Sequence, residues 1–253
     1  LAAVLLKMGA YGFIRFAIPL FPSAAVSAAP FMALLGVIGI IYGALMALAQ
    51  DDIKKLVAYS SISHMGFVTL GIFVFNSQGI QGAILQMFNH GIVTGAMFLA
   101  VGVLYDRTHS RLIGDYGGLH KQTPRFVALF CVFSVASFGL PGTCGFIGEV
   151  LVLLGTSEES FVLVLLAMGG IVLAASYILW MLQRVALGQA GTQVASQLSD
   201  ITVRETVTLA PLALVVFAVG VYPRPLMELI DAGVTKLVEL TRQGVPPEMT
   251  GLF

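Results

Sequence analysis

Charged side chains are scarce in this sequence. Asp, Glu, Lys and Arg make up only 10% of its 253 residues, whereas soluble domains carry about 25%. Hydrophobic residues reach 58%, and a soluble domain of this length would have no means of hiding so much apolar surface. We therefore predict a polytopic membrane protein. The 13 basic and 13 acidic residues balance to a net charge of zero, so nothing indicates a nucleic-acid partner or an acidic soluble one.

Cysteine is rarer still, because Cys131 and Cys144 are the only two in the sequence. Two cysteines are too few for a disulfide framework or a metal site, and we interpret them as small apolar packing residues. His109 and His120 are too far apart in sequence for the usual zinc-ligand spacings, and no cysteine accompanies them. We expect these two histidines to be solvated surface residues and no metal to be bound.

An initiator methionine and the basic start of a signal peptide are also missing. The chain begins with an apolar run, so we expect it to open inside a helix, as a fragment would. The fold class that follows is all-α, a polytopic transmembrane bundle of about seven spans. Prolines at 19 and 22 are expected to end the first span, and prolines at 223 and 225 the last. The predicted spans cover residues 1–18, 30–50, 54–75, 79–104, 125–155, 160–187 and 205–221.

Residues 125–155 form an unusual span, because a bilayer core of roughly 30 Å needs only about 20 helical residues. Glycine and proline between positions 139 and 145 interrupt it, so we predict a discontinuous helix broken around Pro141, Gly142 and Gly145. Glu149 follows the break. An ionisable group at membrane depth indicates a functional site, and a carboxyl group that changes charge near neutral pH can load and release a proton.

Loops without Lys or Arg alternate with loops that contain them. By the positive-inside rule the basic loops face the cytoplasm or the equivalent matrix side. The tail 226–253 mixes apolar and charged residues, which suits an amphipathic interfacial helix. The loops assigned to the cytoplasmic or matrix side contain Lys54, Lys55, Arg107, Arg111, Lys121, Arg125, Arg184 and Arg204.

Lys7 lies within the first predicted span. Tyr11 and Arg15 follow it at a spacing of four, so the three side chains are expected to share a helix face. Lys7 is a candidate functional residue, with a lysine that snorkels to the headgroups as the alternative. We interpret Arg15 as an interfacial anchor.

Two further spans each carry a histidine within a polar stripe. His64 has Ser60 and Ser63 beside it, while Gln86, His90 and Thr94 follow one another at intervals of four, next to Asn89. A lone histidine in a span is often a hydrogen-bonded packing residue. Two adjacent helices with this pattern favour a hydrated proton relay, because imidazole both donates and accepts protons and titrates nearest to neutral pH.

Four long motifs stand out along the chain. They are LLKMGAYG at 5–12, QDDIKKLVAYSSISHMG at 50–66, QMFNHG at 86–91 and LPGTCGFIGE at 140–149. These motifs resemble those of the antiporter-like membrane subunits of respiratory complex I, the proton-pumping NADH:quinone oxidoreductase. In that family the position of Glu149 holds Lys in the L and N types and Glu in the M type, also called chain 4, so the resemblance points to type M.

The resemblance also implies an organisation and a mechanism. Residues 1–20 would end the first of two inverted repeats, 29–188 would form the second five-helix repeat, and 189–253 would hold the last span and the tail. The first half of the family's fold is absent, which implies a fragment or a subunit split between two chains. A proton would pass from Lys7 along His64 and His90 to Glu149. NADH, flavin, iron-sulfur clusters and quinone would be bound by other subunits, and no cofactor by this chain.

The expected partners are the neighbouring antiporter-like and other membrane-arm subunits, within a bacterial cytoplasmic or mitochondrial inner membrane. Three alternatives remain open from the sequence. The chain could belong to a multisubunit sodium/proton antiporter, or to a membrane-bound hydrogenase or formate hydrogenlyase. In the third, it is a structural membrane subunit whose polar residues only join helices.

Overall fold

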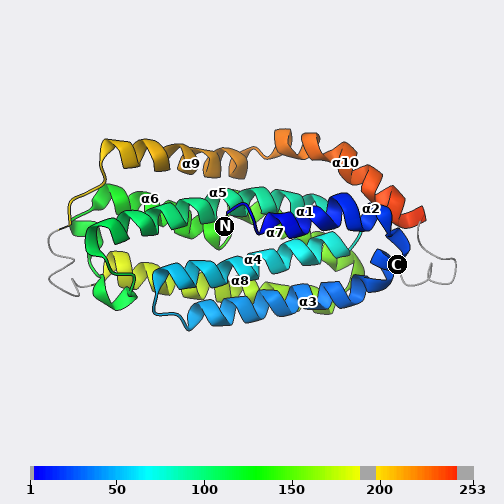
Figure 1. The fold of residues 1–253 in the computed structure, drawn as a ribbon, viewed down its shortest axis with the longest axis horizontal. Coiled ribbons are helices and arrows are strands. Elements are labelled where there is room, and N and C mark those ends of the chain that lie inside the picture. Colours follow the sequence, from blue (N-terminus) through cyan, green and yellow to red (C-terminus); the bar gives the residue numbers. More distant parts are fainter. Residues whose placement is uncertain (1–2, 189–197, 244–253) are drawn as a thin grey trace.

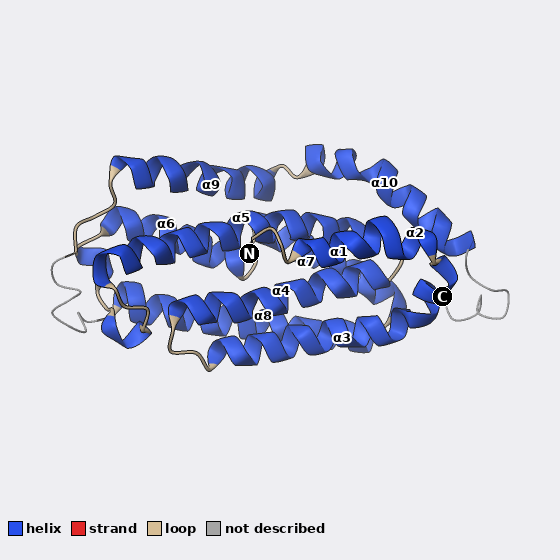
Figure 2. Cartoon of the chain, in the orientation of Figure 1, coloured by secondary structure: helices blue, strands red, loops and turns tan. Residues whose placement is uncertain are grey.

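The computed structural model describes residues 3–188 and 198–243, which form a bundle of helices aligned along one direction (Figure 1). All the elements drawn for these residues are helices, as Figure 2 shows. The predicted all-α fold class is therefore confirmed.

Five helices of the described chain are long and apolar enough to cross a bilayer. They correspond to five of the seven predicted spans, with ends that shift by up to eight residues. The largest shift is at α3, which begins at position 22 rather than 30, because proline suits the first turn of a helix. The five are α3 (Pro22–Leu48), α4 (Ile53–Phe73), α5 (Ser77–Thr108), α8 (Phe161–Leu182, continued by a π-helical turn, Gln183–Leu187) and α9 (Val203–Val221).

The first predicted span consists of three consecutive helical pieces. These are α1 (Lys7–Gly12), a π-helical stretch (Phe13–Ala17) and α2 (Ile18–Leu20). Pro19 does not end this helix, contrary to the expectation. In the wide π turn before it, the N–H of Ile18 bonds to the carbonyl of Phe13, and such a turn accommodates a proline ring that has no N–H to donate.

The predicted discontinuous helix is present as α6 (Pro124–Ser137) and α7 (Cys144–Glu159). Gly139 and Gly142 have positive φ angles of 73° and 91°, a conformation that residues with a Cβ rarely adopt. Pro141 stands between them, and its missing N–H prevents the helix from continuing. Gly145 lies inside the first turn of α7 rather than in the break. A Cβ at that position would collide with the carbonyl oxygen of Ala136.

The described parts of the basic loops lie together at one end of the bundle, at the left in Figure 1. The N–H of Ile53 donates to the carbonyl of Arg111 at 2.9 Å, and the N–H of Ile113 to the carbonyl of Asp51 at 2.8 Å. Arg111 also forms an ion pair with Asp52. The loops that the positive-inside rule assigns to one side of the membrane therefore share one end.

Helix α4 packs closely against α3 because glycines face each other across the contact. A Cβ at Gly66 would lie 2.6 Å from the carbonyl oxygen of Gly36 and 2.7 Å from the nitrogen of Ile40. Small residues that let backbones approach in this way are typical of helix pairs in membranes. The close contact fixes the position of α4, which carries His64.

The C-terminal helix α10 (Arg224–Gln243) has two unlike faces. Val234, Leu237 and Val238 are buried against the bundle, whereas Leu229 is largely exposed. The predicted amphipathic character of the tail is thus found over these residues, and the rest of it, 244–253, lies outside the described residues. The division into inverted repeats (1–20, 29–188 and 189–253) stays a prediction.

Candidate functional site

Four helices bring the candidate residues into one cluster inside the bundle. Lys7 comes from α1, His64 from α4, His90 from α5 and Glu149 from α7. The histidines and the glutamate are only 3–4% exposed, and Lys7 is half-buried. Groups of this kind are costly to bury unless they contact one another.

The cluster forms a line with a definite order. Nζ of Lys7 lies 2.5 Å from Nδ1 of His90. The His90 and His64 rings follow, with centroids 5.4 Å apart and planes inclined by 55°. Nδ1 of His64 then lies 3.2 Å from Oε1 of Glu149. The order Lys7, His90, His64, Glu149 differs from the expected one, in which His64 followed Lys7.

The packing of the helices explains this reversal. Helix α5 lies against the start of the chain, where Gly91 and Gly95 approach Ala3. His90 therefore meets Lys7, while α4 packs against α7 and places His64 beside Glu149. Sequence order alone carries no information about which of two adjacent helices faces a third.

Glu149 has a second partner on α5. The Nε2 amide of Gln86 donates to Oε1 of Glu149 at 3.1 Å. Gly148 allows this contact, because a Cβ there would lie 2.7 Å from Oε1 of Gln86 and 3.0 Å from its backbone nitrogen. The carboxyl group is thus held by an imidazole and an amide in an interior that is otherwise apolar.

Two polar residues of this region were not predicted as site residues. Asn89 donates from Nδ2 to the carbonyl of Cys144 at 2.6 Å, which ties α5 to the start of α7. Tyr177 on α8 is fully buried, and its hydroxyl is one of the buried polar atoms of the described residues that have no hydrogen-bond partner. The sequence signal for Tyr177 was a single phenol in the middle of an apolar span, and Asn89 was noted only as a neighbour of the stripe.

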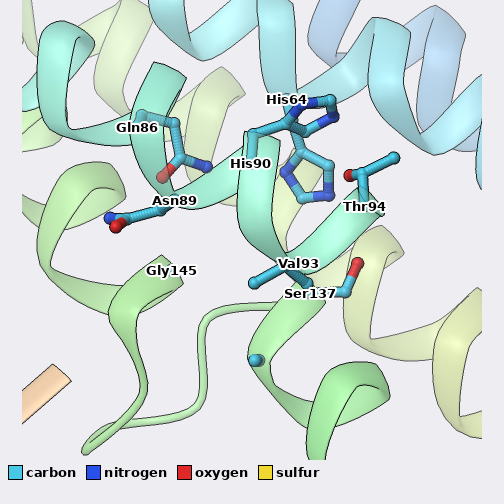
Figure 3. Close-up of a pocket in the computed structure, with 9 residues that line it drawn as sticks. His64, Gln86, Asn89, His90, Val93, Thr94, Ser137 and Gly145 are labelled. Carbon is cyan, nitrogen blue, oxygen red and sulfur yellow. The ribbon is translucent and has the colours of Figure 1, made fainter. Parts of the chain in front are cut away.

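The structure places some of the predicted supporting residues beside the histidines and others away from them. Thr94 and Gln86 line a small cavity beside the histidines, which Figure 3 shows above the loop that joins α6 to α7. Ser60 donates to the carbonyl of Val57 within its own helix, and Ser63 to the carbonyl of Ile40 on α3. Tyr11 is not brought into the line.

The Tyr11 side chain is 48% exposed, and its ring packs edge-on against Phe16. Arg15 is also exposed, which fits the anchor role expected of it. The shared face predicted for Lys7, Tyr11 and Arg15 is interrupted, because the π-helical stretch that begins at Phe13 changes the residue spacing between Tyr11 and Arg15.

The other two histidines and the two cysteines lie outside the line of Lys7, His90, His64 and Glu149. His109 is exposed, but His120 is partly buried and its Nδ1 contacts the carbonyl of Ala186 at 2.9 Å, so it is not the solvated residue that was expected. Cys131 is half-buried and Cys144 is buried at the break, both as free thiols. Within residues 3–188 and 198–243, three or more His, Cys, Asp or Glu side chains nowhere gather into a set able to hold a metal ion.

Known proteins resemble this chain both in sequence and in fold. NADH-quinone oxidoreductase subunit M of Rhodobacter capsulatus is 48% identical over 239 residues, which cover 94% of this chain and 47% of that protein. A chain of respiratory complex I from Thermus thermophilus, solved with bound NADH, superposes with a TM-score of 0.86 at 34% identity, over 96% of this chain and 50% of that one. The chain spans about half the length of the curated relatives it matches.

A chain of the Mrp complex from Dietzia sp. DQ12-45-1b has the same fold, with a TM-score of 0.85 at 18% identity over 96% of this chain and 53% of that one. The profile of the family described as NADH:quinone oxidoreductase/Mrp antiporter, TM, matches residues 1–182. This match and the five apolar helices make the chain an integral membrane protein. The family profile covers well over half of the sequence, and the chain therefore belongs to the NADH:quinone oxidoreductase/Mrp antiporter transmembrane family.

Proposed function

We propose that this chain carries protons across an energy-transducing membrane, as part of the M-type (chain 4) antiporter-like subunit of an NADH:quinone oxidoreductase. The observation that carries the proposal is the line of four proton-binding side chains, Lys7, His90, His64 and Glu149, through the apolar interior of the bundle. Proton relays in membrane proteins are usually formed by intramembrane ionisable groups that contact one another in this way.

Each member of the line has a distinct role in the proposal. Lys7 holds the proton at one end as an ammonium group, and Glu149 accepts it at the other as a carboxylate. His90 and His64 connect them, because each imidazole has one nitrogen that receives a proton and another that releases one. Gln86 holds the carboxylate in place and cannot itself titrate.

Electron transfer takes place outside this chain in the proposal. NADH, flavin, iron-sulfur clusters and quinone are bound by other subunits, and the chain is a non-redox part of the translocase without a complete active site of its own. Redox energy reaches the line through charge changes in the neighbouring membrane-arm subunits, which shift the proton between Lys7 and Glu149. The membrane is the bacterial cytoplasmic or the mitochondrial inner membrane.

A multisubunit sodium/proton antiporter is the second candidate, because the matched family includes Mrp antiporters and a chain of an Mrp complex shares the fold. The 48% identity to a subunit M favours the first candidate. Purification of the native complex decides between them, since only the first predicts that a quinone-reducing peripheral arm is recovered with this chain.

The substitution Glu149→Gln in the complete complex tests the proposal. Glutamine keeps the size and hydrogen-bonding capacity of the side chain and removes the proton that it binds. We expect the complex to assemble, and the rate of proton translocation in proteoliposomes to fall by about a hundredfold or more, because a positioned proton-transfer group typically contributes about 10²–10⁴-fold. Glu159→Gln is the matched control, because that carboxylate is exposed at the end of the same helix.

Proton translocation at the normal rate in the Glu149→Gln complex would remove Glu149 from the route. A purely structural role for the line predicts a different result. In that case Lys7→Ala and Glu149→Gln would both lower the amount of assembled complex, and the complex that does assemble would translocate protons normally.

A further inference from the structure

Helix α9 supplies none of the proton-binding groups, yet it packs against α5, α6 and α7 (Figure 1). Leu209, Ala213 and Val216 are buried along one face of α9, at intervals of four and three residues. Gly220 follows four residues after Val216 and therefore lies on the same face. The opposite face is exposed, with Leu214 as an example. The inward face of α9 thus ends at a glycine.

The start of α9 is tied to its neighbours by side chains. Asp200, just before the helix, accepts hydrogen bonds from the backbone N–H groups of Arg125 and Phe126, at 3.0 and 3.1 Å. These N–H groups belong to the first turn of α6, where a helix offers them no partner. Arg107 on α5 donates two hydrogen bonds to Glu205 in the first turn of α9. The start of α9 is therefore fixed relative to both α5 and α6.

The other end of α9 meets the helix break. A Cβ added at Gly220 would lie 2.4 Å from the carbonyl oxygen of Gly142, and 2.5 and 2.6 Å from the C and Cα atoms of Thr143. All three are backbone atoms, so the rotation of a side chain would not make room. Only glycine at position 220 allows the two backbones to approach so closely.

The break connects this contact to the proton route. Thr143 is the residue immediately before α7, the helix that carries Glu149. The Glu149 carboxyl group lies against the opposite side of the break, since a Cβ at Gly139 would be 2.8 Å from its Oε2 atom. The same short loop is therefore in contact with α9 at one point and with the proton acceptor at another.

We propose that α9 fixes the position of the Glu149 carboxyl group through the break, with Gly220 as the positioning residue. The proposal rests on the proposed function, because it concerns the geometry of that function's proton acceptor. Oε1 of Glu149 lies 3.2 Å from Nδ1 of His64 and 3.1 Å from Nε2 of Gln86. Both distances are near the long end of the hydrogen-bond range, so a small displacement of α7 would break these contacts.

Alanine at position 220 would displace one of the two backbones by about 1 Å, because ordinary van der Waals contact begins near 3.4 Å. The end of α9 is held by the buried side chains of Val216 and Val219. Residues 140–142 of the break are exposed and have less packing to resist the movement. We therefore expect the break to move, and a misplacement of about 1 Å can slow a reaction by about 10²-fold.

The substitution Gly220→Ala in the complete complex tests this role. We expect the complex to assemble and the rate of proton translocation per assembled complex to fall by about 10²-fold. The dependence of the rate on pH should also change, because the surroundings of Glu149 determine the pH range in which it exchanges its proton.

Two control variants separate this effect from packing. Leu209→Ala removes a buried side chain from the same face of α9, far from the break. Gly169→Ala places a Cβ on α8 where it meets no neighbour. Both variants should keep the normal rate of translocation per assembled complex and the normal pH dependence.

Normal translocation by Gly220→Ala would overturn the proposal. An equal loss in Leu209→Ala would also overturn it, as would a loss in Gly220→Ala with unchanged pH dependence, because weaker packing would then explain the result. A cryo-EM map of the unsubstituted complex gives a measurement that does not depend on any variant folding. It should show Gly220 against the backbone of Gly142 and Thr143, and room for a methyl group between them would refute the contact.

Failure of this proposal and failure of the proton route give different results. Loss of proton translocation in Glu149→Gln together with normal translocation in Gly220→Ala would reject the role of α9 and keep the route. Normal translocation in Glu149→Gln would reject the route itself.

Discussion

His64 and Glu149 are 85 residues apart in sequence, yet Nδ1 of the first lies 3.2 Å from Oε1 of the second. The contact crosses from α4 to α7 in an interior where both side chains are almost fully buried. Removal of Glu149 would leave Nδ1 of His64 without its partner in an apolar surrounding, which costs more than the contact itself contributes. The helix break beside Glu149 and the packing of α4 are therefore parts of one arrangement.

The opposite end of the line gives the first prediction. Lys7→Gln removes the positive charge beside Nδ1 of His90 and keeps a polar side chain in a half-buried position. We expect the complex to assemble and its rate of proton translocation to fall by about a hundredfold or more, because the proton donor of the line is lost. Translocation is measured as acidification of proteoliposomes that contain the complete complex.

Arg15→Gln is the control for Lys7→Gln, since it removes a cation from the same helical segment at an exposed position. Equal rates for the two variants would contradict a specific role for Lys7. The comparison also separates the relay from a general effect of net charge on this side of the bundle.

The helix break gives the second prediction. Gly139 and Gly142 both have positive φ, so an alanine at either position should cost about 1–2 kcal/mol of backbone strain. Only at Gly139 would the new Cβ approach Glu149, at 2.8 Å from Oε2, whereas at Gly142 it would meet no neighbour. We expect similar losses of thermal stability in the two variants, and slower proton translocation per assembled complex in Gly139→Ala alone.

Stability is measured by thermal unfolding of the purified complex, and activity by proton translocation at a temperature where both variants remain folded. If Gly142→Ala slowed translocation as much as Gly139→Ala, the effect would belong to the break as a whole. The position of the Glu149 carboxyl group would then not be the sensitive feature.

The sequence was sufficient to predict the helices and the break, and for identifiable reasons. Apolar length predicts spans directly, and two glycines with a proline inside four residues, 139–142, are typical of an interrupted membrane helix. Proline was less informative than expected at position 19, where a π-helical turn accommodates it, and at position 22, where it begins α3. A local signal of this kind does not distinguish the end of a helix from its first turn.

The order of the site residues could not be predicted from the sequence. Polar stripes identified His64 and His90 as facing inward, but which of them meets Lys7 depends on how α5 lies against the first helix. The cavity between them and the contact of Asn89 with Cys144 depend in the same way on side chains from different helices. Properties of single helices are predictable from residue spacing, and contacts between helices are not.

The last prediction concerns the attachment of α9 to the bundle. Arg107 near the end of α5 donates two hydrogen bonds to the Glu205 carboxylate, at 2.8 and 2.7 Å, and Glu205 also accepts from the backbone of Thr202 at 2.7 Å. Because both charged side chains are only 17% exposed, Arg107→Gln should weaken the first turn of α9 by about 1–2 kcal/mol. Hydrogen exchange of the first α9 amides should then accelerate by about 5–30-fold.

The Arg224–Glu228 pair provides the control, since its side chains are 73% and 65% exposed. Arg224→Gln should change hydrogen exchange in α10 by about twofold or less. If the two variants accelerated exchange equally, partial burial and two-point geometry would not explain the strength of the Arg107–Glu205 pair. An unchanged exchange rate in α9 would show that its apolar contacts with α5 and α7 hold the helix without the ion pair.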